Sequence, residues 1–122
     1  MKWITDGIYV RVISKRVAEG SLYNKKLPVI TILDQYTFEV YSDELNREFT
    51  NLREKDVETV LPRSKDVQKD PNKCSVLIVR GRHRGQSGKI HSIDKQRDQV
   101  KILIDFSDLV TVSQDDCSLK SK

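Results

Sequence analysis

The residues best suited to chemistry lie in one short stretch, VLIVRGRHRGQSGKI, at residues 76–90. It begins with an apolar run of strand length, which Gly81, Gly85 and Gly88 then interrupt before apolar residues resume. Between the glycines stand cationic side chains, and such a density of positive charge needs water or an anionic partner. The candidate phosphate-binding residues are Arg80, Arg82, His83, Arg84 and Lys89.

Phosphate contact is the function that this chemistry favours. Arginine donates paired, charge-assisted hydrogen bonds to phosphate oxygens, and each neutralised phosphate releases counterions. The alternative is a solvated loop whose charges keep a sheet edge from aggregating. We favour phosphate contact because neighbouring cations repel one another and are a poor choice for solubility alone. His83 and His91 have rings that can stack on bases, but both also fit an ordinary surface role.

A second group of candidate RNA-binding residues comprises Tyr23, Lys25 and Lys26. In this group the tyrosine would stack on a base and the lysines would follow the backbone. A structured loop with Tyr23 packed onto its own domain is an equal alternative. Trp3 is expected in the core rather than as a stacking platform, because a lone tryptophan near the start of a small domain is usually buried.

The sequence offers no recognisable catalytic or metal-binding arrangement. Its glycine spacing fits neither the dinucleotide-binding nor the Walker pattern, and no Ser-His-Asp, Cys-His or paired-carboxylate arrangement is readable. Cys74 and Cys117 stand alone without a C-x-x-C, and the histidines lack ligand spacing. We therefore expect a protein that is not an enzyme and holds no cofactor or metal.

Composition narrows the class of partner. The chain has 122 residues, of which 37% are hydrophobic and 33% charged, with a net charge of +4 that favours an anionic partner such as nucleic acid. No apolar run approaches the roughly 20 residues needed to span a bilayer, and no signal peptide is readable at the N-terminus. We expect no membrane association, and unpaired cysteines fit a cytosolic or nuclear compartment.

Short apolar or alternating runs separated by turns predict an all-β protein built as two small β-barrels in tandem. A single helical turn is expected at 53–56. The expected boundaries are a domain at 1–63, a polar linker at 64–73, a second domain at 74–113 and a fraying polar tail at 114–122. The expected strands are 8–13, 28–33, 36–41, 47–52 and 57–61 in the first domain, and 76–79, 90–93, 100–104 and 109–112 in the second.

The basic stretch resembles the KOW motif, in which a valine-rich strand leads into Gly-x-x-Lys-Gly-x-x-Gly-x-Val. The matching positions are Gly81, Arg84, Gly85, Gly88 and Ile90. Arginine replaces the lysine and isoleucine the valine, and both changes keep the charge or the β-branched shape of the position. The glycines would serve the turns and the close approach of the loop to the barrel.

The whole chain resembles the C-terminal tandem of SH3-like KOW domains in the G-patch and KOW-motif splicing factor family. The blocks that carry this resemblance are KWITDGIYVRVISK, GSLYNKK and DELNREFTNLREKDVETVLP, in that order. The kin-type nuclear DNA- and RNA-binding proteins, whose C-terminal module has a leading tryptophan and a glycine-rich KOW loop, are a second resemblance. No G-patch is matched in these residues, so the resemblance assigns no helicase activation to them.

The resemblance implies a nuclear, monomeric RNA-binding module of a pre-mRNA splicing factor. Its partners would be single-stranded RNA, bound with low specificity, and spliceosomal proteins. Two other functions stay open: a protein-docking module inside a ribonucleoprotein assembly, and a kin-type DNA- or RNA-binding module in DNA repair or replication. RNA binding through phosphates should weaken steeply with salt, whereas docking through apolar contacts should change much less.

Overall fold

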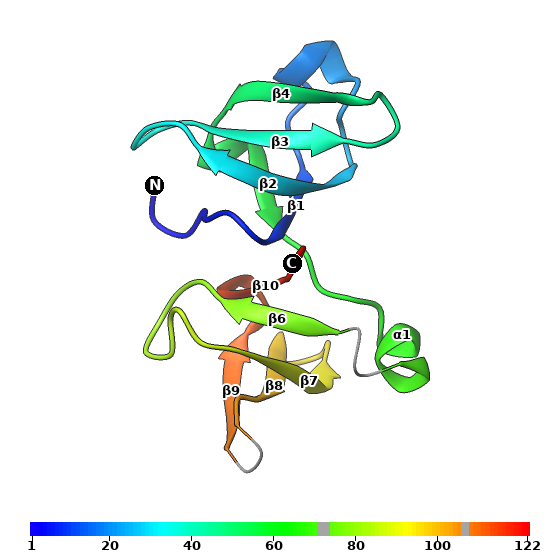
Figure 1. Ribbon diagram of the computed structural model, residues 1–122. Coiled ribbons are helices and arrows are strands. Elements are labelled where there is room, and N and C mark those ends of the chain that lie inside the picture. The colour runs from blue at the N-terminus through cyan, green and yellow to red at the C-terminus, as the bar shows by residue number, and fades with distance from the viewer. Residues whose placement is uncertain (71–73, 106–107) are drawn as a thin grey trace. The chain divides into compact units, whose positions relative to one another are not determined.

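The computed structural model describes residues 1–70, 74–105 and 108–122 (Figure 1). The chain divides into a first unit, Met1–Val60 with Ser121–Lys122, and a second unit, Leu61–Lys120. Each unit contains one five-stranded sheet in which every paired neighbour is antiparallel. The predicted all-β fold of two small SH3-like barrels is thereby confirmed.

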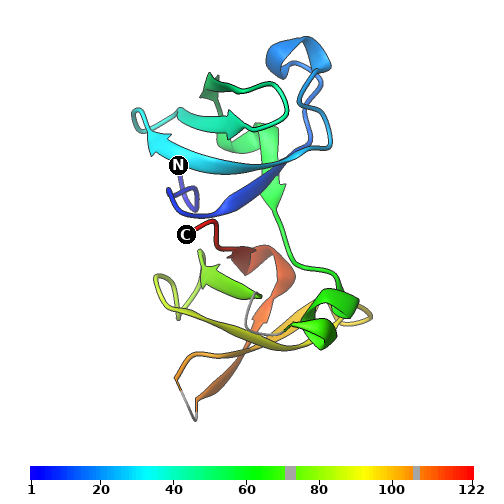
Figure 2. The ribbon, with the colours of Figure 1, turned by 45° about the vertical axis from the view of Figure 1, so that its right-hand side comes forward.

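In the first unit the strand order is β4-β3-β2-β1-β5, and the strands curl around a common interior (Figure 1, Figure 2). Buried residues alternate with half-buried ones along β1 and β3, as a sheet with one covered face requires. Trp3 is 4% exposed, so its predicted place in the core is confirmed. The strands are β1 (Tyr9–Val12), β2 (Lys26–Ile32), β3 (Phe38–Ser42), β4 (Arg47–Leu52) and β5 (Val57–Thr59).

Two 3₁₀ turns complete the first unit, η1 (Val17–Gly20) and η2 (Glu54–Asp56), the second at the position of the predicted helical turn. The Asp56 carboxylate is buried and accepts a hydrogen bond from Arg16 Nη2 at 2.5 Å and from Arg53 N at 2.9 Å. This carboxylate therefore ties the segment before η1 to the turn that leads into β5.

In the second unit the strand order is β10-β6-β7-β8-β9. The buried core comprises Val76, Ile78, Ile90, Val100, Ile102 and Cys117. The strands are β6 (Ser75–Ile78), β7 (Ser87–Asp94), β8 (Gln99–Leu103), β9 (Leu109–Ser113) and β10 (Cys117–Leu119).

The segment expected as a linker contains a short helix, α1 (Ser64–Lys69), which belongs to the second unit. Leu61 and Val67 pack against the core of that unit. One apolar residue in a polar helix of six residues cannot show a helical period, so the sequence does not predict α1. The helix depends on its packing against the core of the second unit. Residues 71–73 of the expected linker lie outside the described residues. None of the helices in the described ranges is long and apolar enough to cross a membrane.

The segment expected as a fraying tail also differs from the structure. Residues 114–119 form η4 (Gln114–Asp116) and β10, and β10 pairs with β6 through Cys117 and Ile78. Ser118 is fully buried although it is polar, and a strand of three residues is too short to stand out from the polar residues around it in the sequence. The last two residues, Ser121–Lys122, belong to the first unit, where Ser121 N donates to Gly7 O at 2.9 Å.

Candidate nucleic-acid interface

The cationic residues are presented by a closed turn between β6 and β7, residues 79–86, which we call the basic loop. At its base Ile78 N donates to Gln86 O and Gly85 N donates to Ile78 O, both at 2.8 Å. Inside it Arg84 N donates to Gly81 O at 3.2 Å. The backbone that carries the arginines is therefore ordered by its own hydrogen bonds.

The glycines that match the KOW motif serve two different needs. Gly81 and Gly85 have φ of +88° and +92°, a left-handed conformation that favours glycine. Gly88 is required by space, because a Cβ there would lie 2.4 Å from Leu103 O and 2.8 Å from Ile102 Cγ2 on the neighbouring strand. The first two shape the loop, and the third lets β7 approach β8.

Asp116 in η4 anchors the start of the basic loop. Its carbonyl oxygen accepts hydrogen bonds from Val79 N at 2.7 Å and Arg80 N at 3.3 Å. This contact was not predicted, because residues 114–122 were expected to form a polar tail. The available signal was the spacing of Cys117 and Leu119, two apolar residues at strand period.

The structure places the predicted cations of this region on two elements. Arg80, Arg82 and Arg84 are exposed on the basic loop with His83 half-buried between them, whereas Lys89 is exposed on β7. The side chains of Arg82, His83 and Arg84 form no hydrogen bond or ion pair with the residues that the structure describes. Their donors are therefore available to an anion.

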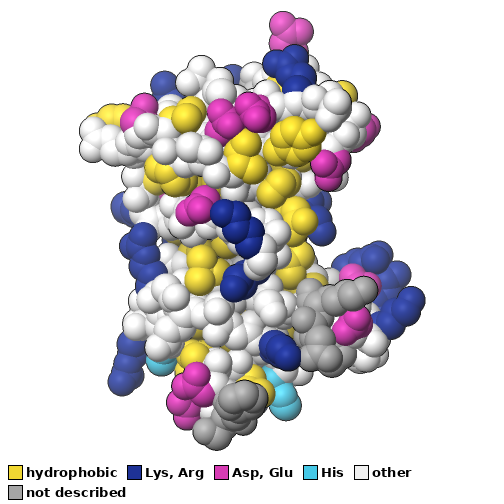
Figure 3. Space-filling view, viewed as in Figure 1, with side chains coloured by type: hydrophobic (Ala, Val, Ile, Leu, Met, Phe, Trp, Pro, Cys, Tyr) yellow, Lys and Arg dark blue, Asp and Glu magenta, His cyan; other side chains and the backbone are white. Residues whose placement is uncertain are grey.

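Over the face seen in Figure 3, Lys and Arg side chains are interspersed with Asp and Glu side chains. The net charge of +4 is correspondingly small beside the 22 Lys and Arg residues of the chain. An anion would therefore be attracted by local groups such as the basic loop more than by the charge of the whole chain.

The predicted group of Tyr23, Lys25 and Lys26 is divided among different partners. The Lys25 ammonium forms an ion pair with the Glu44 carboxylate. The Lys26 ammonium lies 4.8 Å from the centroid of the Tyr9 ring, a cation–π contact that the sequence did not reveal. The structure therefore gives the two lysines separate roles within the first unit.

Tyr23 itself is 45% exposed, so it is not tucked onto the barrel. The Lys15 ammonium lies 5.1 Å from the centroid of its ring. A base stacking on Tyr23 would thus meet Lys15 rather than the two lysines that follow it closely in sequence.

Both cysteines are free and buried in the second unit. Burial raises the pKa of Cys117 to about 12, and the neighbouring Asp116 and Asp115 add to the effect. Burial also raises the pKa of Cys74. Since a thiolate and not a thiol is nucleophilic, neither cysteine is arranged for covalent chemistry. In the ranges that the structure describes, no cluster of three or more His, Cys, Asp or Glu residues is placed to hold a metal ion.

The KOW motif family model matches residues 75–105, which run from β6 through β8 and include the basic loop. This is the class of motif that the glycines and cations predicted.

Beyond the residues that match the family model, several curated proteins are similar to this chain over most of its length. The DNA/RNA-binding protein KIN17 of Mus musculus is 32% identical over 112 residues, covering 88% of this chain and 25% of the relative. The G-patch domain and KOW motifs-containing protein homolog 1 of Caenorhabditis elegans is 29% identical over 115 residues, covering 93% and 23%. A KIN17-like protein of Arabidopsis thaliana is 29% identical over 103 residues, covering 84% and 23%.

The resemblance to both predicted families is therefore confirmed. The chain spans about a quarter of the length of these curated relatives, between 23% and 25%.

Proposed function

We propose that this chain is a non-catalytic RNA-binding module of a nuclear pre-mRNA splicing factor, which contacts RNA phosphates through the basic loop. The observation that carries this proposal is the pair of exposed arginines, Arg82 and Arg84, whose side chains have no partner among the described residues. Their guanidinium groups can meet phosphate without first breaking an internal ion pair.

The neighbours of this pair support an anionic ligand. Arg80 and Lys89 are exposed and add positive potential, and His83 offers a half-buried ring beside the arginines. Phosphates are common to all sequences, so contacts of this kind bind single-stranded RNA with low specificity. The names of the relatives connect KIN17 to DNA and RNA, and G-patch and KOW motifs to each other.

The Tyr23, Lys25 and Lys26 group does not enter this proposal. The Lys25 charge is compensated by Glu44, and the Lys26 ammonium is engaged with the Tyr9 ring. An RNA interface built on these residues would have to break both contacts.

The test is an NMR titration of the full chain with a short single-stranded RNA, at low salt and at about 0.15 M. We expect shifts at residues 80–89 that diminish with salt. The double variant Arg82→Ala/Arg84→Ala should bind more weakly, with a log–log salt dependence shallower by about 1.4, since each phosphate contact to a single strand contributes about 0.7.

The matched control is Lys95→Ala/Arg97→Ala, which removes the same charge from exposed residues in the turn between β7 and β8. If this control weakens binding as much as the loop variant does, net charge and not the basic loop is responsible. An unchanged affinity in the loop variant would reject the proposed site. The same titration with single-stranded DNA distinguishes an RNA module from a general nucleic-acid module.

A further inference from the structure

A row of two tyrosines and a proline crosses three strands on the outer face of the first unit's sheet. Tyr9 on β1 pairs directly with Pro28 on β2. Val29 pairs with Val40, so the residues next to them, Pro28 and Tyr41, also face each other across β2 and β3. The members of the row are half-buried, and each is adjacent along its strand to buried residues that point into the core.

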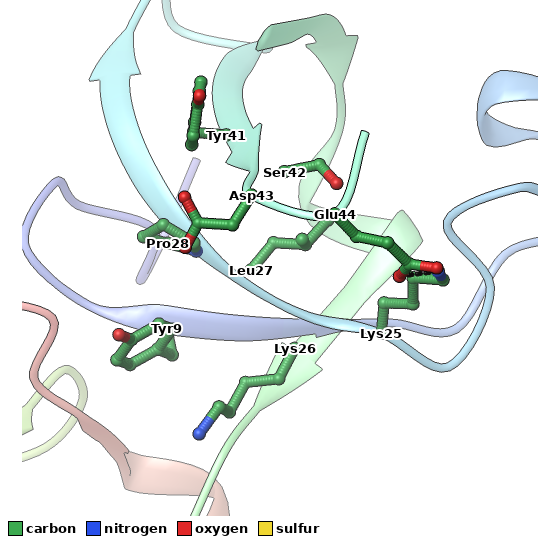
Figure 4. A pocket seen from close by; sticks show the side chains of 9 residues that line it. All are labelled: Tyr9, Lys25, Lys26, Leu27, Pro28, Tyr41, Ser42, Asp43 and Glu44. Carbon is green, nitrogen blue, oxygen red and sulfur yellow. Dashed lines mark hydrogen bonds and ion pairs between the residues drawn. The ribbon is translucent and has the colours of Figure 1, made fainter. Parts of the chain in front are cut away.

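This row lines a surface groove of about 400 Å³, which we call the tyrosine groove. Figure 4 shows Tyr41, Pro28 and Tyr9 following one another across the strands, with Asp43 and Lys26 also at the groove. The groove thus combines aromatic and proline surfaces with two charges of each sign. Lys25 and Glu44 form an ion pair with each other, which leaves Lys26 and Asp43 as the charges outside that pair.

The spacing of the tyrosines matches the repeat of a polyproline II helix. Tyr9 and Tyr41 are separated by two strand intervals, or about 9.6 Å. A polyproline II helix rises about 3.1 Å per residue and repeats every three residues, or about 9.3 Å. Side chains one turn apart in such a helix can therefore meet the two rings in succession, and aromatic-lined grooves are known to bind this conformation.

The charges at the two ends of the groove differ. Asp43 is exposed and its carboxylate forms no hydrogen bond or ion pair with the residues that the structure describes. Glu48, which pairs with Tyr41 on β4, is also exposed. The Lys26 ammonium occupies the Tyr9 end. A basic residue therefore fits at the Tyr41 end, where the carboxylates would repel a phosphate.

We propose that the tyrosine groove binds a proline-rich segment of another protein in the polyproline II conformation, with an arginine or lysine of that segment against Asp43. Two prolines of the segment lie one turn apart on Tyr9 and Tyr41, the first taking the place of the Lys26 ammonium over the Tyr9 ring, and Pro28 forms the floor between them. This inference goes beyond the proposed RNA binding, because it uses the other unit and a different class of partner.

The first test is an NMR titration of the full chain with a peptide of two Pro-x-x-Pro repeats and one terminal arginine. Two versions with the arginine at opposite ends cover both directions of binding. We expect shifts at Tyr9, Lys26, Tyr41 and Asp43 with at least one version. A peptide with alanine in place of every proline should cause none, because it lacks the rigid ridge.

Variants separate the contribution of the rings from other effects. Tyr41→Ala should weaken binding about tenfold, the loss expected when a central aromatic contact is truncated. Tyr41→Phe keeps the ring, loses only the hydrogen bond from the Tyr41 hydroxyl to Asn46 Oδ1, and should keep most of the affinity. The dispersion of the NMR spectrum of the Tyr41→Ala variant itself shows whether that variant is folded. The matched control is Tyr36→Ala, because Tyr36 is 67% exposed and lies between β2 and β3 outside the groove. Equal losses in the Tyr41→Ala and Tyr36→Ala variants would overturn the proposal.

The charge contact is tested by combining Asp43→Asn with a peptide in which alanine replaces the arginine. Either change alone should weaken binding, and the second change should then add little, because both remove the same ion pair. If the two losses of affinity add in full, the arginine of the peptide does not contact Asp43.

Single-stranded RNA serves as the competing ligand. If RNA shifts the groove residues and neither peptide does, the groove is a nucleic-acid site and the proposal is rejected; shifts with neither ligand also reject it. The RNA binding proposed above is assessed separately, because its shifts fall at residues 80–89 in the second unit.

Discussion

At the scale of single residues, Gly88 is the glycine at which an added methyl group would lie nearest to its neighbours. An added Cβ would meet the Leu103 carbonyl oxygen at 2.4 Å, and a backbone atom in a paired strand cannot move aside as a side-chain end can. We expect Gly88→Ala to lower the free energy of unfolding of the second unit by about 1–3 kcal/mol, the usual cost of overpacking.

Urea unfolding monitored by NMR signals of the second unit measures this effect. The control is Ser87→Ala, an exposed neighbour on β7, which should change stability by less than about 0.5 kcal/mol. Similar stabilities for the two variants would show that β7 and β8 can separate at low cost.

Cys117 should make the stability of the second unit depend on alkaline pH. Burial raises its pKa from an ordinary value of 9.0 to about 12 in the folded chain. Above pH 9 the unfolded thiol loses its proton while the folded thiol keeps it, so the unfolded state is favoured. The contribution of this thiol to stability is therefore complete below pH 9 and is lost as the pH rises toward 12.

The measurement is urea unfolding under reducing conditions from about pH 8 to about pH 10, for the natural chain and for Cys117→Ala. The variant should be less stable at every pH because it leaves a cavity, but its stability should fall less steeply with pH. Parallel curves for the two proteins would show that other groups account for the alkaline loss.

At the scale of elements, β10 stabilises the strand and the turn from which the basic loop extends. It pairs with β6, contributes Cys117 to the core, and follows the Asp116 carbonyl that receives Val79 N. We expect a chain ended at residue 113 to lose the dispersed NMR signals of the second unit, whereas a chain ended at residue 120 should keep them.

The signals of the first unit serve as the internal reference, because its sheet contains none of the removed strand. The chain ended at residue 120 controls for the loss of Ser121 and its hydrogen bond to Gly7. A chain ended at residue 113 with an intact second sheet would mean that β6 is stable without its outer partner.

The elements that sequence predicts well are those whose own residues carry the pattern. β1 and β8 lie within a residue of their expected ranges because their apolar residues recur at strand period. The helix α1 is short and polar, and β10 offers only Cys117 and Leu119 as a pattern, so contacts with residues distant in sequence are what place both elements. Patterns of this length are too short to predict an element by themselves.

The candidate site follows the same rule. The cations and glycines of the basic loop are readable because their types and spacing are local. The ion pair of Lys25 with Glu44 and the support of the loop by Asp116 join residues far apart in sequence. For that reason the sequence could predict which side chains are cationic but not which of them are already engaged.

At the scale of the whole molecule, the division into two units allows the proposed RNA binding to be tested in one unit alone. The second unit, Leu61–Lys120, holds its complete sheet, its core and the basic loop. We expect residues 61–120 alone to fold and to show the same RNA-induced shifts as the full chain. A comparison of the two NMR spectra measures this.

Two outcomes of that comparison would contradict the expectation. An unfolded spectrum would show that the second unit depends on the first for stability. A folded spectrum with much weaker RNA binding would show that residues of the first unit contribute to the interface.

The hydrogen bonds that close the basic loop also influence the heat and entropy of any complex that it forms. Fixing the backbone of one residue costs about 1–2 kcal/mol in conformational entropy, and in this loop that cost falls on folding and not on binding. Calorimetry of RNA binding should therefore show a small entropic penalty from the protein. A Gly81→Ala variant, which strains the left-handed turn, would transfer part of that penalty to the complex and would weaken it without removing a single charge.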